Sequence, residues 1–371
     1  MGGVRDGMVK KGKGILLGQM GFNKGGGNIN WFPGHMAAAT KAIRSRLKVS
    51  DFVIEVRDAR IPLSSANQDL QPMLSGKRRV IALNKKDLAN PNIMHRWIRY
   101  FDSCKHDCLA INAHSKSSVQ QLLDLVEFKL KEVISREPTL LVMVVGVPNV
   151  GKSALINSIH QIASYRFPLQ HKTKRATVGP LPGVTQDIAG YKIAHQPSVY
   201  VLDTPGVLVP SIADIETGLK LALAGSVKDS VVGEERIAQY LLAVLNTRGT
   251  PFHWKHLFGR ATEGVKPAYD VKDLLPNRRK PQNNSDVLYV ENYVTEVKRA
   301  LYTTLSEFNG SLESEGDLEN LIDQQFDMLQ IALKIPHKAS EARTMVSKKF
   351  LALFRMGKLG PFILDDVPDI S

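Results

Sequence analysis

A glycine-rich segment near the middle of the chain has the residue types and spacing of a phosphate-binding loop. Gly146, Gly151, Lys152 and Ser153 form the pattern G-x-x-x-x-G-K-S, with an apolar run before it and an apolar stretch from Ala154 after it. This context predicts a buried strand, a loop and a helix, the arrangement that a P-loop needs. The glycines let backbone N–H groups surround a phosphate, and the helix N-terminus adds positive potential. We expect Lys152 to reach the β- and γ-phosphates and Ser153 to bind Mg²⁺.

A polar loop earlier in the chain indicates which base the nucleotide carries. Residues 79–83 predict a buried strand, and Asn84-Lys85-Lys86-Asp87 follows it directly. In such an N-K-x-D loop, Asp87 accepts hydrogen bonds from guanine N1–H and the exocyclic amine, Lys85 lies along the base, and Asn84 braces the surrounding loops. Adenine lacks that amine, and a hydrogen bond to a charged group is worth about 1.5–3 kcal/mol. The loop therefore favours GTP and disfavours a P-loop ATPase or kinase.

Three further segments are expected to complete the nucleotide site. Asn112 and Ala113 follow a short strand and loosely match the loop whose backbone N–H binds guanine O6. Thr185 ends a Pro-Gly-Val-Thr segment and is placed to contact Mg²⁺ and the γ-phosphate. Asp203 and Gly206 form a D-x-x-G, which brings a carboxylate near Mg²⁺ and a glycine N–H near the γ-phosphate. The expected GTP-binding residues are Asn84, Lys85, Asp87, Asn112, Ala113, Asn149, Val150, Gly151, Lys152, Ser153, Ala154, Thr185, Asp203 and Gly206.

Length and charge limit the other possibilities. The 371 residues are enough for two domains with full cores. A net charge of +13 favours a polyanionic partner, either RNA, DNA or an anionic membrane, although a basic organelle protein without such a partner has the same composition. Cys104 and Cys108 are interpreted as reduced structural thiols. The sequence has no apolar run of about 18 residues, so no transmembrane helix is predicted.

The chain divides into three predicted parts. Residues 1–29 are glycine-rich and basic, and either an organellar presequence or a disordered tail explains them. Residues 30–228 predict an α/β G domain, a mostly parallel sheet with flanking helices. Residues 229–371 predict an all-α C-terminal domain that binds RNA or the ribosome.

Two predicted helices of the G domain have distinctive faces. The helix at 36–49 exposes Lys41, Arg44, Arg46 and Lys48. The helix at 118–136 is amphipathic, and its expected core positions are Val119, Leu122, Leu123, Val126, Phe128 and Leu130.

The last predicted helix, at 339–355, is also basic. Glu341 is the only acid in and around it, and the basic residues there are Lys338, Arg343, Lys348, Lys349, Arg355 and Lys358. Such a face either binds RNA phosphates or is an ordinary solvated surface.

The motifs occur in an order that differs from that of Ras-like GTPases. The N-K-x-D at 84–87 precedes the P-loop at 146–153 and the D-x-x-G at 203–206, whereas in Ras-like GTPases it follows them. The same sheet forms if the old termini are joined and new ends open after the D-x-x-G. The chain then passes from this nucleotide-sensing segment straight into the helical region, which a nucleotide-dependent change is expected to move.

Together with Trp31–Met36, Asp58-Ala59-Arg60 and Phe354–Gly360, these motifs resemble the circularly permuted GTPases of the YlqF/YawG family, in the mitochondrial DAR GTPase branch. The resemblance covers about residues 30–364. It implies a GTPase that cycles between GTP and GDP and assists assembly of the large ribosomal subunit by binding that subunit and its rRNA. It also implies a mitochondrial location, in the matrix or at the periphery of the inner membrane, with chloroplast or cytoplasm second. A GTPase acting on a protein or tRNA-modification partner without ribosome contact is the alternative.

The catalytic step requires a group that the D-x-x-G segment lacks. Ras-type GTPases orient the attacking water with a glutamine after D-x-x-G, and Val207 occupies that position here. The family resemblance implies that His35 is the catalytic residue. It also implies that Asn149 supports a K⁺ ion, which supplies positive charge at the phosphates. On the residues alone, His35 could equally cap a helix and Asn149 could equally shape the loop.

Overall fold

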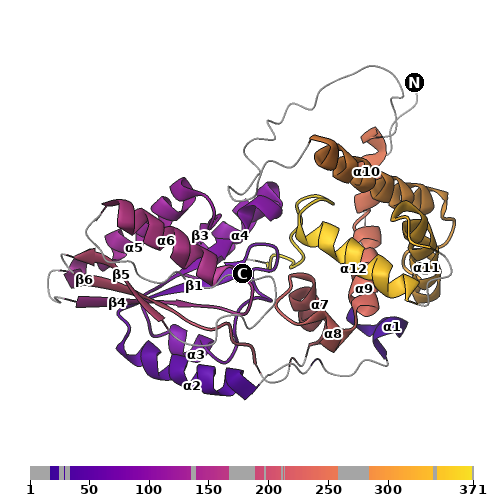
Figure 1. The fold of residues 1–371 in the computed structure, drawn as a ribbon. Helices are drawn as coiled ribbons and strands as arrows, with labels where there is room; N and C mark the ends of the chain where they lie inside the picture. Colours follow the sequence, from indigo (N-terminus) through magenta and orange to yellow (C-terminus); the bar gives the residue numbers. More distant parts are fainter. Residues whose placement is uncertain are drawn as a thin grey trace, which may run out of the picture.

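The computed structural model describes residues 17–24, 29, 34–134, 139–166, 189–195, 198–209, 212, 214–257, 284–336 and 341–369. In this part of the chain, a six-stranded sheet with helices on both faces lies beside a group of packed helices (Figure 1). The expected α/β class with a largely helical remainder is confirmed.

The sheet has the order β3-β2-β1-β4-β6-β5. All neighbouring strands are parallel except β5, which is antiparallel to β6. The strands are β1 (Phe52–Asp58), β2 (Arg79–Asn84), β3 (Asp107–Ala110), β4 (Thr139–Val145), β5 (Ala189–His195) and β6 (Ser198–Asp203). Because parallel strands all end at the same edge, the polar segments after β1, β2, β4 and β6 meet there.

Helices cover both faces of the sheet, which explains why β1 is buried along its whole length and why β4 is almost entirely apolar. Helices α2 (Gly34–Val49), α3 (Gln71–Leu74) and α4 (Pro91–Ser103) lie on the face that carries Val53 and Ile81, and α5 (Lys116–Ile134) and α6 (Lys152–Arg166) lie on the opposite face. Alternate side chains of β4 pack into the hydrophobic cores on the two faces of the sheet. Met143 and Val145 pack in the cluster that contains α2, whereas Val142 and Val144 belong to the larger core.

The expected core face of α5 contains one error. Val119, Leu122, Val126 and Leu130 are buried, but the Phe128 side chain is 63% exposed. Phe128 follows Val126 by two residues, so the turn of the helix carries it away from the core side.

The helical group surrounds α9 (Glu234–Thr247), which contacts α7 (Ile215–Leu223), α8 (Asp229–Val232), α11 (Glu315–Ala332) and α12 (Ala342–Arg355). Helix α10 (Asn284–Glu307) packs on α11 and on a 3₁₀ segment, η3 (Thr250–Leu257). Buried Asn246 and Gln325 exchange two side-chain hydrogen bonds of 2.8 Å and join α9 to α11. The domain boundary at residue 228 stays a prediction, and α7, which precedes it, packs on α9.

The N-terminal segment corrects the prediction of a tail that extends to residue 29. The short helices η1 (Leu17–Gln19) and α1 (Gly21–Lys24) pack against α9, and Met20, Asn23 and Ile29 are buried. Arg236 Nε of α9 donates to Asn23 Oδ1 at 2.7 Å. Buried apolar residues such as Met20 and Ile29 anchor this segment, although its glycine-rich, basic composition did not predict any packed structure. Residues 1–16 lie outside the described residues, and a presequence or a tail there stays a prediction.

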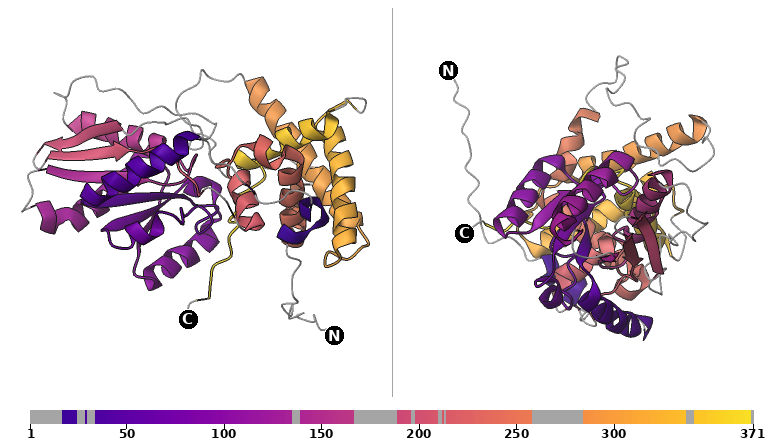
Figure 2. Two further views of the ribbon diagram at one scale, coloured as in Figure 1. Left: turned by 90° about the horizontal axis from the view of Figure 1, so that it is seen from below. Right: turned by 90° about the vertical axis from the view of Figure 1, so that its left-hand side faces the viewer.

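The C-terminal segment, residues 356–369, runs from α12 back to the sheet and is called the C-terminal strap here (Figure 2). Phe362 N donates to Leu88 O at 3.1 Å, and Leu364 N donates to Arg60 O at 2.7 Å. The buried Asp365 carboxylate accepts from the backbone N–H groups of residues 63 and 64 at 2.8 and 2.9 Å. The strap therefore joins the helical group to the loops that follow β1 and β2.

Candidate nucleotide-binding site

Asn84, at the end of β2, connects the loops of the site. Its Nδ2 donates to Val150 O of the P-loop at 2.8 Å, and its Oδ1 accepts from Ala113 N at 2.9 Å. This is the geometry expected of a residue that braces the loops around a base. The Ala113 N–H, which is expected to bind guanine O6, donates to Asn84 Oδ1 in this structure. A bound guanine would have to share this N–H with Asn84.

The P-loop glycines are required by close backbone approaches. Gly151 has φ +94°, a left-handed conformation, and a Cβ there would collide with the Asn84 side-chain amide. At Gly146, a Cβ would collide with the carbonyl oxygen of Val56. A Cβ on Gly206 of the D-x-x-G would lie 3.1 Å from Lys152 Nζ. The D-x-x-G segment therefore packs directly on the P-loop, as a sensor of the γ-phosphate must.

Lys152 is buried at the start of α6, and its Nζ donates to Val147 O at 2.9 Å. Burial lowers the pKa of this amine to about 8, although the Asp203 carboxylate opposes the shift. A phosphate group placed at Nζ would replace the carbonyl as its partner and would stabilise the charged form.

Asp203 and Ser153 fit a hard divalent cation. Ser153 Oγ lies 3.4 Å from Asp203 Oδ2, and the buried Asp203 Oδ1 has no hydrogen-bond partner among the described residues. Burial raises the pKa of Asp203 to about 6, with Lys152 acting in the opposite direction. A buried carboxylate oxygen beside a hydroxyl is the donor set that Mg²⁺ prefers, with phosphate oxygens as further ligands. Thr185, the third expected Mg²⁺ contact, lies outside the described residues.

The base-recognition loop adopts an unusual backbone conformation. Lys85 has φ +64°, and its Nζ donates to Asp58 Oδ2 at 2.9 Å. Asp87 follows in the short η2 helix (Lys86–Leu88) and is exposed, as a residue that meets a ligand from solvent should be. Asn112 Oδ1 accepts from His114 N at 2.8 Å, so this side chain shapes its own loop.

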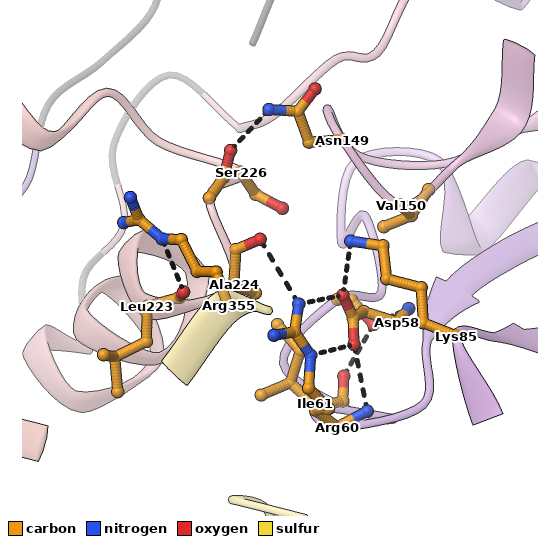
Figure 3. Close-up of polar contacts among 12 residues, drawn as sticks. Asp58, Arg60, Ile61, Lys85, Asn149, Val150, Leu223, Ala224, Ser226 and Arg355 are labelled. Atoms are coloured by element: carbon orange, nitrogen blue, oxygen red, sulfur yellow. Dashed lines mark hydrogen bonds and ion pairs between the residues drawn. The ribbon is translucent and has the colours of Figure 1, made fainter. Parts of the chain in front are cut away.

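The P-loop is tied to the turn that follows α7 (Figure 3). Asn149 has φ +59°, and its Nδ2 donates to Gly225 O at 2.8 Å. Ser226 Oγ donates to Pro148 O at 2.7 Å. The K⁺ role of Asn149 stays a prediction, and the structure adds a second role for the residue, as a contact between the P-loop and the helical group.

Asp58 and Arg60 are site residues to which the sequence analysis assigned no chemistry. Both are buried, and Arg60 Nη2 lies 2.8 Å from Asp58 Oδ2. The available signal was an acid and a base two residues apart at the end of a buried strand, beside the expected ligand edge.

The structure describes the surroundings of the catalytic step only in part. His35 lies in the first turn of α2, but the position of its side chain lies outside the described residues. Val207 is fully buried in the cluster formed with α2, and its carbonyl accepts from Asn67 Nδ2 at 2.8 Å. The side chain of the residue after the D-x-x-G therefore faces the core.

Comparisons with known proteins agree with this geometry. A family model described as a 50S ribosome-binding GTPase matches residues 141–292. Short integuments 2, mitochondrial, from Arabidopsis thaliana is 72% identical to this chain, over 97% of this chain and 94% of its own length. DAR GTPase 2, mitochondrial, from the same plant is 39% identical over 93% and 92%.

The chain belongs to the circularly permuted DAR GTPases. It is therefore a GTP-hydrolysing enzyme, and the order of its motifs is that of the family. Mitochondrial ribosome-associated GTPase 1 of Mus musculus is 41% identical over 59% of this chain and 67% of its own length.

Asp87→Asn is expected to weaken GTP binding by about 10-fold or more, because the amide cannot replace a charged acceptor worth about 1.5–3 kcal/mol. Binding of xanthosine triphosphate should improve at the same time, since its base presents an acceptor where guanine presents an amine. Competition of both nucleotides against a fluorescent GDP analogue measures the preference. Asp102→Asn, at an exposed carboxylate on α4, is the control, and an unchanged preference for GTP in Asp87→Asn would refute the base-recognition role.

GTP binding is expected to take up a proton at pH 8.5. Because the pKa of Lys152 in the free protein is about 8, most of this amine is neutral at pH 8.5 and becomes charged when it meets the triphosphate. At pH 7 it is already charged in both states, so uptake should be small. Isothermal titration calorimetry in buffers of different ionisation enthalpy measures the protons. Equal uptake at the two pH values would show that Lys152 does not contact the phosphates.

Proposed function

We propose that this GTPase binds the large subunit of the mitochondrial ribosome through its rRNA and assists assembly of that subunit, with the bound nucleotide controlling release. The main support is the family itself, whose matching model is described as 50S ribosome-binding and one of whose mouse relatives is named ribosome-associated. These names do not favour the alternative, a GTPase that acts on a protein or tRNA-modification partner without ribosome contact.

The basic residues of α12 are partly paired with acids of other helices, and an RNA contact on this face stays a prediction. Arg343 pairs with Glu235 at 2.9 Å and with Asp323 at 2.7 Å, and Arg355 pairs with Asp229 at 2.6 Å. Lys348 Nζ lies 3.6 Å from Glu234, and Lys349 Nζ donates to Leu333 O at 3.4 Å. The acids belong to α8, α9 and α11, far from α12 in sequence, so local charge counting could not detect them.

Helix α2 offers a better surface for RNA. Lys41, Arg44, Arg46 and Lys48 are exposed, the helix contains no acid, and none of the four forms an ion pair in the described part of the chain. At helical spacing, Lys41, Arg44 and Lys48 form one stripe on the side opposite buried Ile43 and Leu47. Positive charge that no protein carboxylate neutralises is available to RNA phosphates. We assign the rRNA contact to this stripe.

The same helix begins at the proposed catalytic residue. His35 lies in its first turn, and Ala39, Ile43 and Leu47 of α2 pack in the cluster that holds Val207. A contact that shifts α2 would therefore move His35 relative to the segment after the D-x-x-G. We propose that RNA binding to α2 brings His35 to the attacking water. Mg²⁺ held by Ser153 and Asp203, and K⁺ near Asn149, would supply charge at the phosphates.

The location is proposed from the relatives, three of which are named mitochondrial. We propose the matrix, with association at the periphery of the inner membrane as a second site. No helix in the described ranges is long and apolar enough to cross a membrane.

Lys41→Glu combined with Arg44→Glu should weaken binding to purified large subunits and flatten its salt dependence. Each phosphate contact contributes about 0.9 to the slope of log affinity against log salt concentration for a duplex, so the slope should fall by about 1.8 for two contacts. Cosedimentation at several salt concentrations measures both quantities. Lys348→Glu with Lys349→Glu, on α12, is the comparison and should change the slope less. The opposite ranking would place the RNA contact on α12.

His35→Ala should retain GTP affinity and lose the hydrolysis that large subunits stimulate, because the buried Val207 offers no side chain for the water. Turnover is measured with and without large subunits, and affinity with a fluorescent nucleotide. His95→Ala, at an exposed histidine on α4, controls for the loss of any imidazole. If stimulated turnover persists in His35→Ala, His35 only caps or packs at the start of α2.

A further inference from the structure

Asp58 and Arg60 form a buried, two-pronged ion pair at the carboxyl end of β1. The residues are 1% and 3% exposed. Arg60 Nε donates to Asp58 Oδ1 at 2.9 Å, and Arg60 Nη2 donates to Oδ2 at 2.8 Å. Removing two charges from water is costly, so a buried pair contributes little to stability compared with apolar residues of similar size. Its placement is better explained by a third group that it holds.

That third group is Lys85 of the base-recognition loop. Its Nζ donates to Asp58 Oδ2 at 2.9 Å, on the oxygen that also faces Arg60 Nη2 (Figure 3). A lysine side chain rotates about four bonds and loses much rotamer freedom when it is fixed in one orientation. Because Asp58 fixes Lys85 before the nucleotide binds, the loss of rotamer freedom does not reduce the affinity for the base.

Arg60 is in turn held on several sides. Its guanidinium lies 5.7 Å from the centre of the Phe354 ring on α12, and its Nη2 lies 3.5 Å from Ala224 O. Its backbone oxygen accepts from Leu364 N of the C-terminal strap at 2.7 Å. Arg60 therefore has little freedom, and Asp58 is fixed through it.

We propose that Asp58 is a positioning residue for guanine-nucleotide binding that acts through Lys85, and that Arg60 keeps Asp58 in the required orientation. This rests on the proposed nucleotide site, in which Lys85 lies along the base. Weakening the pair should let bound GDP leave faster, because Lys85 would then sample orientations that do not support the base.

The test is a double-mutant cycle on the full-length chain, with release of a fluorescent GDP analogue followed by stopped flow. Asp58→Asn keeps the size of the side chain and removes its charge, and we expect release about 10-fold faster than in the wild type. Lys85→Met should have an effect of similar size. The double variant should release no faster than Lys85→Met alone, because residues that act through one contact are not additive.

Glu55→Gln is the matched control for breaking a buried ion pair. Glu55 is 2% exposed on the same strand and pairs with Arg57 at 2.8 Å and Arg79 at 3.2 Å. It should lower the thermal unfolding midpoint without changing GDP release. Arg60→Lys keeps the positive charge but loses the two-pronged geometry, and should give an intermediate release rate even if Asp58→Asn fails to fold.

Multiplicative effects of Asp58→Asn and Lys85→Met, or an unchanged rate in Arg60→Lys, would overturn the proposal. Equal acceleration by Glu55→Gln would also overturn it, because any broken ion pair would then have the same effect. Failure of the wild type to bind the GDP analogue would instead refute the nucleotide site itself.

Discussion

The nucleotide edge depends on one amide side chain. Asn84 joins the carbonyl of Val150 in the P-loop to the N–H of Ala113, so three segments that are distant in sequence are held by two hydrogen bonds. The bond to the P-loop brings the Asn84 amide so close that position 151 must be glycine. The site needs these loops to lie together at the ends of parallel strands, whatever their order along the chain. Their order along the chain can therefore change, and a permuted sequence can build the same site.

A second set of contacts leads from the phosphates to the helical group. The turn that follows α7 is bonded to Pro148 and Asn149 of the P-loop. Arg355 of α12 donates to the carbonyls of Ala222 and Leu223 just before that turn, at 2.8 and 3.1 Å. These bonds link the P-loop to the end of α7 and, through Arg355, to α12. The Asp58–Arg60 pair provides a parallel connection from Lys85 of the base-recognition loop to α12 and the C-terminal strap.

Motifs and elements could be predicted from the sequence because their causes are local. The P-loop strand and helix, the loop at 84–87 and the helices of the C-terminal half follow from apolar periodicity and from fixed spacing of glycines and polar residues. The errors arose where the cause is not local. The acids that neutralise Arg343 and Arg355 lie on other helices, and the anchoring of Met20 needs a surface on α9 that its own sequence does not reveal. The strap was missed for the same reason, since Asp365 finds its partners about 300 residues away.

Permutation also bears on how α2 would join the proposed ribosome contact to the proposed catalytic step. In this chain α2 precedes β1, so it is tied to the sheet at its C-terminal end through Ser50 and β1. Upstream of α2, Ile29 forms an isolated antiparallel bridge with Ile212. Its apolar side rests on Val207, next to the D-x-x-G, and its opposite side carries the basic stripe. In the proposed mechanism, a force applied by RNA to that stripe would be transmitted across one helix diameter to the segment next to the D-x-x-G. A helix placed between two ligands in this way can couple them without a separate domain movement, because both contacts act on the same rigid body.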